Sequence, residues 1–165
     1  AARSAKEQIA NRYPPSARAF DAYLKGEQAF RVGTADAYRE ARSRFGDAQI
    51  VAGFDLARIR EADAMMALIA IEPPTAAAGL TAALKAVSLI LDQAGLGEYP
   101  SAELYAARLR LANLLDQFDP QSSATGEQRR EWFELAVTLK PNYAEPYRLF
   151  SDYLARAGKP MRLMC

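Results

Sequence analysis

The sequence predicts an all-α protein, and three observations support this fold class. The 165-residue chain is rich in Ala, Leu, Arg and Glu, which are strong helix formers. It has no convincing strand-length alternation of polar and apolar residues, and no Asn-Gly or Asp-Gly hairpin turn. Proline and glycine recur about one helix length apart, and both end helices: proline lacks the N–H, and glycine adopts the left-handed cap conformation without strain.

The breaks in the first half of the chain define four helices. They fall at Pro14-Pro15, at Gly33-Thr34 and at Gly53. Thr34 is an expected N-cap, because its hydroxyl can accept from an unpaired N–H of the first helical turn. The predicted helices are 2–12, 16–32, 35–50 and 54–71.

The second half of the chain follows the same rhythm. Thr75 and Ser101 are expected N-caps, and Thr125 precedes Gln128 by three residues, which is the spacing of a capping box. Pro141-Asn142 and Gly158 mark the last two helix ends. The predicted helices are 75–94, 101–117, 125–139 and 143–157. Because the connections are short, neighbouring helices are expected to be antiparallel.

Composition argues against several classes of function. The formal net charge is +1, which gives no long-range attraction to nucleic acid. The chain has no His, its one Cys is Cys165, and it contains no phosphate loop or nucleophile elbow. No apolar run approaches the roughly 20 residues of a membrane span; the longest, 82–91, contains Lys85. We therefore expect a non-enzyme without cofactor or metal, with no nucleic-acid partner and no direct membrane insertion.

Two helices near the C-terminus carry a repeat-like pattern. Tyr147, Phe150 and Leu154 fall at i, i+3 and i+7, with Ser151 beside them, and so form one helical stripe. In the preceding helix, the aromatic residue Phe133 and the small residue Ala136 lie three apart, and Pro141 ends the helix. A small residue lets a neighbouring helix approach closely, and the aromatic ring fills the space beside it.

A second copy of the pattern lies upstream. Ala41, Phe45 and Ala48 match an A-x3-F-x2-A helix, and Tyr23-Leu24-Lys25-Gly26 supplies the helix before it, with Gly26 as the small residue. With these motifs the chain resembles the tetratricopeptide repeat (TPR) arrays of bacterial regulatory and envelope proteins. The resemblance covers residues 17–158. It weakens over 72–124, which are either divergent repeats or an inserted helical hairpin.

The resemblance implies a single TPR-like domain over residues 1–165. The expected architecture is a right-handed superhelix of about three antiparallel helix pairs, namely 16–53, 54–94 and 101–141. Helix 2–12 would lead the array and helix 143–157 would cap it with a polar outer face. The alternative is a plain helical bundle in which the matches are accidental.

The resemblance also implies a concave groove that holds a peptide or a partner protein. The groove would be lined by Tyr23, Glu27, Phe30, Arg31, Asp63, Met66, Arg148, Asp152 and Arg156. An equally simple interpretation is that Tyr23 and Phe30 pack against helix 2–12, since a ring facing an adjacent helix is usually core. Charged residues more often belong to a solvated face, which is also the simplest interpretation of Arg129 and Arg130.

The function predicted from the sequence is a non-catalytic protein-interaction module. One alternative is a homo-oligomeric scaffold that associates through the array ends or the leading helix. Another is a carrier of an apolar small molecule, with residues 76–91 as the apolar segment. The chain begins with Ala rather than Met. The bacterial cytoplasm and the periplasm are both open as compartments. An N-terminal Ala favours the periplasm, because it is expected for a processed or excised segment.

Overall fold

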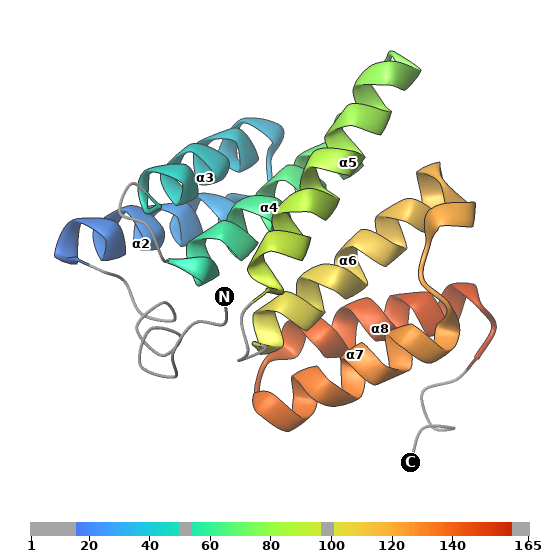
Figure 1. Ribbon diagram of the computed structural model, residues 1–165. Helices are drawn as coiled ribbons and strands as arrows, with labels where there is room; N and C mark the ends of the chain where they lie inside the picture. The colour runs from blue at the N-terminus through green and yellow to red at the C-terminus, as the bar shows by residue number, and fades with distance from the viewer. Residues whose placement is uncertain (1–15, 50–53, 97–100, 160–165) are drawn as a thin grey trace. The chain divides into compact units, whose positions relative to one another are not determined.

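A computed structural model describes residues 16–49, 54–96 and 101–159, and these residues are helical with short connections and no strand (Figure 1). The all-α prediction is therefore confirmed. The predicted helix 2–12 lies outside the described residues. The elements are α2 (Ala17–Val32), α3 (Ala35–Asp47), α4 (Asp55–Ile71), α5 (Ala77–Ala94), α6 (Ala102–Phe118), the short 3-10 helix η1 (Pro120–Ser122), α7 (Gly126–Leu139) and α8 (Ala144–Arg156).

The described helices begin and end within a few residues of their predicted bounds. Thr34 accepts a hydrogen bond from the Ala37 N–H at 3.2 Å, and Ser101 accepts one from Leu104 at 3.1 Å. Thr125 and Gln128 form the predicted capping box, in which each side chain accepts from the backbone N–H of the other residue. These side-chain caps explain why the helix starts could be predicted from the sequence.

The predicted cap at Thr75 is wrong. Helix α5 starts one residue later, with Ala76 in the N-cap position, and no side chain caps it. Two prolines precede Thr75 and restrict the backbone before it. Because Ala76 is the N-cap residue, the Thr75 hydroxyl lies one position too early to reach the free N–H groups of the first turn.

The chain divides into two compact units, and the division falls after Pro100. Unit 1 comprises Ala1–Pro100 and unit 2 comprises Ser101–Cys165. Within unit 1, α2 packs on α3, α3 on α4, and α4 on α5. Within unit 2, α6 contacts both α7 and α8, which also contact each other. That one superhelical array extends across both units stays a prediction.

A glycine and a ring form the contact between α2 and α3. Phe45 is fully buried, and a Cβ added at Gly26 would lie 2.6 Å from its Cε1 atom. This distance is shorter than side chains tolerate, so a hydrogen at position 26 lets the ring seat on α2. Tyr23 extends the cluster, with ring centroids 5.7 Å from Phe45 and 5.4 Å from Phe54. The small residue and the ring therefore pack as the sequence pattern indicates.

The core of unit 2 is built around two stacked rings. Phe133 of α7 and Phe150 of α8 stack with centroids 4.8 Å apart, and Ala106 and Leu109 of α6 pack on the same cluster with Leu154. The remaining ring of the predicted stripe, Tyr147, meets Phe133 edge-on at 5.3 Å and is partly exposed. Three helices therefore share one apolar centre in this unit.

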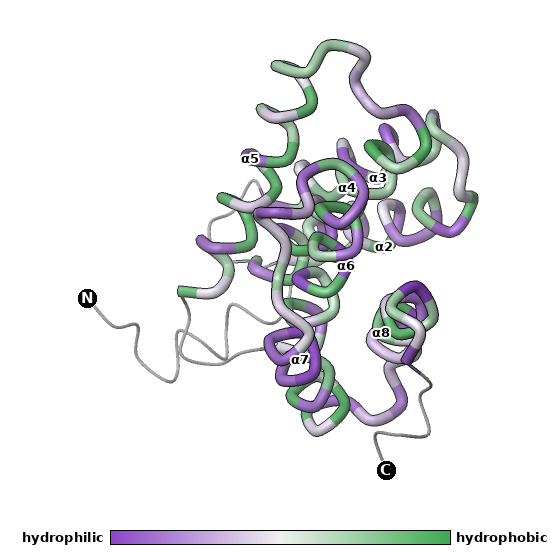
Figure 2. The backbone as a smooth tube through the Cα atoms, turned by 90° about the vertical axis from the view of Figure 1, so that its right-hand side faces the viewer, coloured by the Kyte–Doolittle hydropathy of each residue, from purple (hydrophilic) through white to green (hydrophobic). Residues whose placement is uncertain are grey.

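Helix α5 differs from the other helices in its apolar character, and Figure 2 shows hydrophobic positions along its length. By length and composition alone it could cross a membrane, which for a single helix is weak evidence. Of its residues, only Leu84, Val87, Leu91 and Ala94 are buried.

Candidate functional site

The residues predicted for the groove in unit 1 are largely engaged in packing. Tyr23 lies between the rings of Phe45 and Phe54. Phe30 meets Tyr38 edge-on at 5.1 Å and lies beneath the guanidinium of Arg60, whose Cζ is 4.3 Å from the ring centroid. These contacts hold both predicted aromatic side chains against neighbouring helices.

Two predicted carboxylates of unit 1 meet at Arg60. Its Nε donates to Glu27 of α2 at 2.6 Å, and its Nη1 donates to Asp63 of α4 at 2.8 Å. Arg60 and Asp63 are both buried, so their charges depend on each other to offset the loss of hydration. The triad links α2 to α4 and thus has a clear structural role.

The other two residues predicted for unit 1 differ from each other in exposure. Met66 is fully buried in α4, whereas Arg31 is exposed near the end of α2. Of the six groove residues predicted for unit 1, Arg31 is exposed, whereas the other five are buried or half-buried. Unit 1 therefore offers little exposed chemistry from the predicted set.

The residues predicted for unit 2 lie on the exposed side of α8. Arg148, Asp152 and Arg156 follow one another at intervals of four residues, and their side chains are about half exposed. Arg148 pairs with Glu145 at 3.1 Å and with Asp152 at 3.5 Å. The helix thus presents charges of alternating sign along one face.

Helix α6 adds a second line of polar side chains. Arg110, Asn113 and Asp116 lie three residues apart and so share one helical face. Arg156 of α8 donates to Asn113 Oδ1 at 2.7 Å and to Asp116 Oδ2 at 3.1 Å, and Arg110 donates to Glu145. We call this set the α6–α8 polar row: Arg110, Asn113, Asp116, Glu145, Arg148, Asp152 and Arg156.

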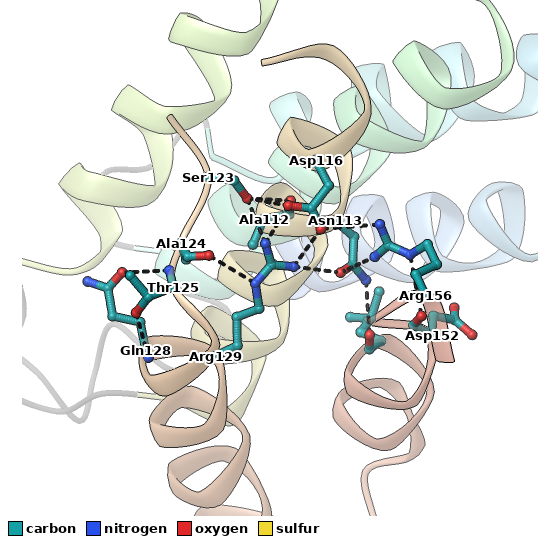
Figure 3. A network of polar contacts seen from close by, with 11 residues as sticks. Ala112, Asn113, Asp116, Ser123, Ala124, Thr125, Gln128, Arg129, Asp152 and Arg156 are labelled. Atoms are coloured by element: carbon teal, nitrogen blue, oxygen red, sulfur yellow. Dashed lines mark hydrogen bonds and ion pairs between the residues drawn. The ribbon is translucent and has the colours of Figure 1, made fainter. Parts of the chain in front are cut away.

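A buried arginine of α7 binds α6 residues of the α6–α8 polar row. Arg129 is 2% exposed, and its Nη1 and Nη2 donate to the two carboxylate oxygens of Asp116 at 2.8 and 2.5 Å (Figure 3). The same side chain donates to Ser123 Oγ at 2.7 Å and to the Ala124 carbonyl at 3.2 Å. Tyr153 covers its guanidinium, with Cζ 4.2 Å from the ring centroid. The interpretation of Arg129 as solvated is wrong, whereas Arg130 is exposed.

Asp116 receives these hydrogen bonds in its charged form. Burial alone would raise its pKa, but the hydrogen bonds from Arg129 and Ser123 and the positive charges of Arg129 and Arg156 outweigh burial and lower the pKa below its ordinary value of 3.8. The carboxylate is therefore ionised at neutral pH and holds the two arginines, which come from different helices.

The sequence contains a signal for the buried arginine that the pattern analysis missed. Arg129, Phe133 and Ala136 fall at i, i+4 and i+7, so Arg129 belongs to the buried stripe of α7 rather than to its exposed side. A charge on a buried stripe predicts a partner carboxylate. Nothing in the local sequence identifies that partner as Asp116, which precedes Arg129 by 13 residues and lies on another helix.

The α6–α8 polar row can form hydrogen bonds and ion pairs with a bound molecule. The row displays guanidinium, amide and carboxylate groups on two helices whose positions are held by the buried Arg129. Among the residues that the structure describes, no group of acidic or sulfur side chains is placed to hold a metal ion. Comparisons with protein families, with curated proteins and with solved structures found no match to this chain.

Proposed function

We propose that this protein is a non-catalytic interaction module that binds a peptide or a partner protein on the α6–α8 polar row. The observation that carries the proposal is the half-exposed series Arg148, Asp152 and Arg156 on α8. Arg156 is held by Asn113 and Asp116 of α6, which accept its hydrogen bonds, and Arg148 pairs with Asp152. Preorganised charged side chains on rigid helices lose little freedom on binding, so more of their interaction energy becomes affinity.

The packing of unit 2 supports a TPR-like architecture for this surface. In such arrays the first helix of each pair contacts its own partner helix and also the first helix of the next pair. Helix α6 contacts α7 and α8 in this way. In unit 1, the seating of Phe45 on Gly26 supplies the ring-and-small-residue contact of the repeat. On this proposal the polar row faces the groove of a right-handed superhelix.

The chemistry of the row indicates the kind of peptide. Arg148 and Arg156 donate to carboxylates, and Asp152 and Glu145 accept from basic side chains. A partner segment with alternating acidic and basic residues would match this order of charges. The contribution of each exposed pair is modest, which favours a reversible complex whose affinity falls with salt.

The test starts from a library of random peptides selected on the immobilised full chain. The affinity of enriched peptides is then measured by calorimetry for the parent protein and for Arg148→Ala and Asp152→Ala. Each substitution should weaken binding about tenfold if its side chain is an anchor. Arg130→Ala, an exposed arginine of α7 outside the row, is the matched control and should leave affinity unchanged.

Two outcomes would overturn the proposal. The first is a selection that enriches no peptide. The second is an affinity that stays the same in the Arg148→Ala/Asp152→Ala double variant, whose helical circular dichroism should match that of the parent chain. In that case the row would be only a solvated face of the fold.

A further inference from the structure

Helix α5 presents a second face, opposite the buried one, that no described residue covers. Six of the exposed residues on this face are spaced three and four apart, which is the seam spacing of paired helices. Leu89 is 58% exposed and Leu96, just beyond the helix end, is 84% exposed. This outer stripe consists of Ala78, Ala82, Lys85, Leu89, Asp92 and Leu96.

The two faces of α5 have the same periodicity. The inner face is formed by the buried residues Leu84, Val87, Leu91 and Ala94, on the helix that packs against α4. An amphipathic surface helix normally turns a charged face toward water. Here four of the six residues of the outer stripe are leucines and alanines and two are charged, so the stripe resembles the seam of a helix that has a partner on both sides.

Lys85 and Asp92 are the only charged residues of α5, and both lie on the outer stripe. They are seven residues apart, or about 10.5 Å along the axis, which is too far for them to pair with each other. Neither makes an ion pair with any residue in 16–49, 54–96 or 101–159. Some exposed charges on other helices, such as Lys25 with Asp21, pair within their own helix.

We propose that the outer stripe of α5 binds the same stripe of a second copy of this chain in antiparallel orientation. A two-fold axis passing close to Leu89 brings Lys85 of each copy opposite Asp92 of the other, because the two charges are nearly equidistant from that point. Leu89 of one copy meets Leu89 of the other at the centre, and Leu96 of each copy lies beside the small residue Ala82 of the other. A parallel pairing is disfavoured because it would place Lys85 beside Lys85.

Charge complementarity also favours a second copy of the chain over a lipid bilayer as the partner of the outer stripe. In a membrane, Lys85 would enter the hydrocarbon in the middle of the helix, where a charged side chain is costly, whereas Asp92 lies near the C-terminal end. In the antiparallel pair the same two residues are satisfied. The outer stripe and the α6–α8 polar row consist of different residues, so the two proposals can fail independently.

The test is sedimentation of the full chain over a concentration series. The parent chain should pass from monomer to dimer as its concentration rises. Lys85→Glu places a carboxylate opposite Asp92 of the second copy, and Asp92→Lys places an amine opposite Lys85. Each variant alone should dimerise at least about tenfold more weakly, since two attractive pairs become repulsive. Both substitutions lie on an exposed face, and circular dichroism should show unchanged helix content.

The decisive sample is the equimolar mixture of the two variants. In a mixed dimer both pairs are again opposite in charge, so dimerisation should return to the parent level. A parent chain that stays monomeric at every concentration overturns the proposal. So does a pair of variants that dimerise as well as the parent, or a mixture that fails to recover. A monomer that floats with phosphatidylglycerol vesicles would assign the stripe to a membrane surface instead.

Discussion

At the scale of single residues, Arg129 shows how a buried charge organises unit 2. Its guanidinium donates to side chains of α6 and of the loop before α7, and Tyr153 of α8 stacks on it. Helices α6, α7 and α8 thus meet at one side chain. Removing one partner of such a buried pair typically costs about 3–5 kcal/mol, because the other charge is left uncompensated.

This contact predicts a pH-dependent effect of Asp116→Asn. The folded chain lowers the pKa of Asp116, so the carboxylate adds stability that is fully present above its unfolded pKa of 3.8. That stability is lost as the pH falls through the folded pKa. At pH 7 we expect Asp116→Asn to lower the free energy of unfolding by about 1–3 kcal/mol, less than at a fully buried pair because the Asp116 side chain is 25% exposed. Below the folded pKa the parent carboxyl is also neutral, so the difference should shrink.

Urea unfolding at a series of pH values measures the stability difference between the two proteins. Asp152→Asn, at an exposed carboxylate of α8, is the control and should change stability little at any pH. A difference between parent and Asp116→Asn that stays constant down to pH 2 would contradict the assigned role of the carboxylate.

At the scale of elements, two threonines that look alike in sequence behave differently. Thr125 closes a capping box on α7, whereas Thr75 precedes the N-cap of α5 and caps nothing. We predict that Thr125→Ala lowers the free energy of unfolding by about 1 kcal/mol, the usual value of an N-cap side chain. Thr75→Ala is the matched control and should have almost no effect. Thermal unfolding of both variants measures the difference, and equal losses would contradict the capping assignment.

The sequence determines the bounds of the helices better than it determines their contacts. Helix bounds were predictable because caps, prolines and glycines act locally, within a few residues. The contact of Gly26 with Phe45 was also predictable in kind, since the pattern of a ring and a small residue indicates close helix packing. The partners of Arg129 were not, because its hydrogen bonds depend on which helix faces which, and no local spacing records that.

The predicted groove residues also divide into those whose position could be predicted from the sequence and those whose contacts could not. Helical periodicity places Arg148, Asp152 and Arg156 on one face, and the structure joins that face to α6. Periodicity cannot distinguish an aromatic residue that faces a ligand from one that faces a neighbouring helix, since both lie on an inner face. Tyr23 and Phe30 therefore needed the positions of Phe45, Phe54 and Tyr38 before their contacts could be assigned.

At the scale of the whole molecule, the division after Pro100 predicts how the chain unfolds. Each unit has its own ring cluster, centred on Phe45 in unit 1 and on Phe133 with Phe150 in unit 2. If these clusters stabilise the units separately, damage to one should not open the other. A cooperative array, in contrast, would spread the loss over all its helices.

Phe45→Ala and Phe150→Ala test this as a reciprocal pair. Each removes a buried ring and should destabilise its own unit by about 3–5 kcal/mol. Hydrogen exchange read by mass spectrometry should show faster exchange in α2–α4 for Phe45→Ala, with α6–α8 unchanged, and the opposite for Phe150→Ala. Each variant serves as the control for the other. If either substitution speeds exchange in every helix, the two units fold as one cooperative body and share their stability.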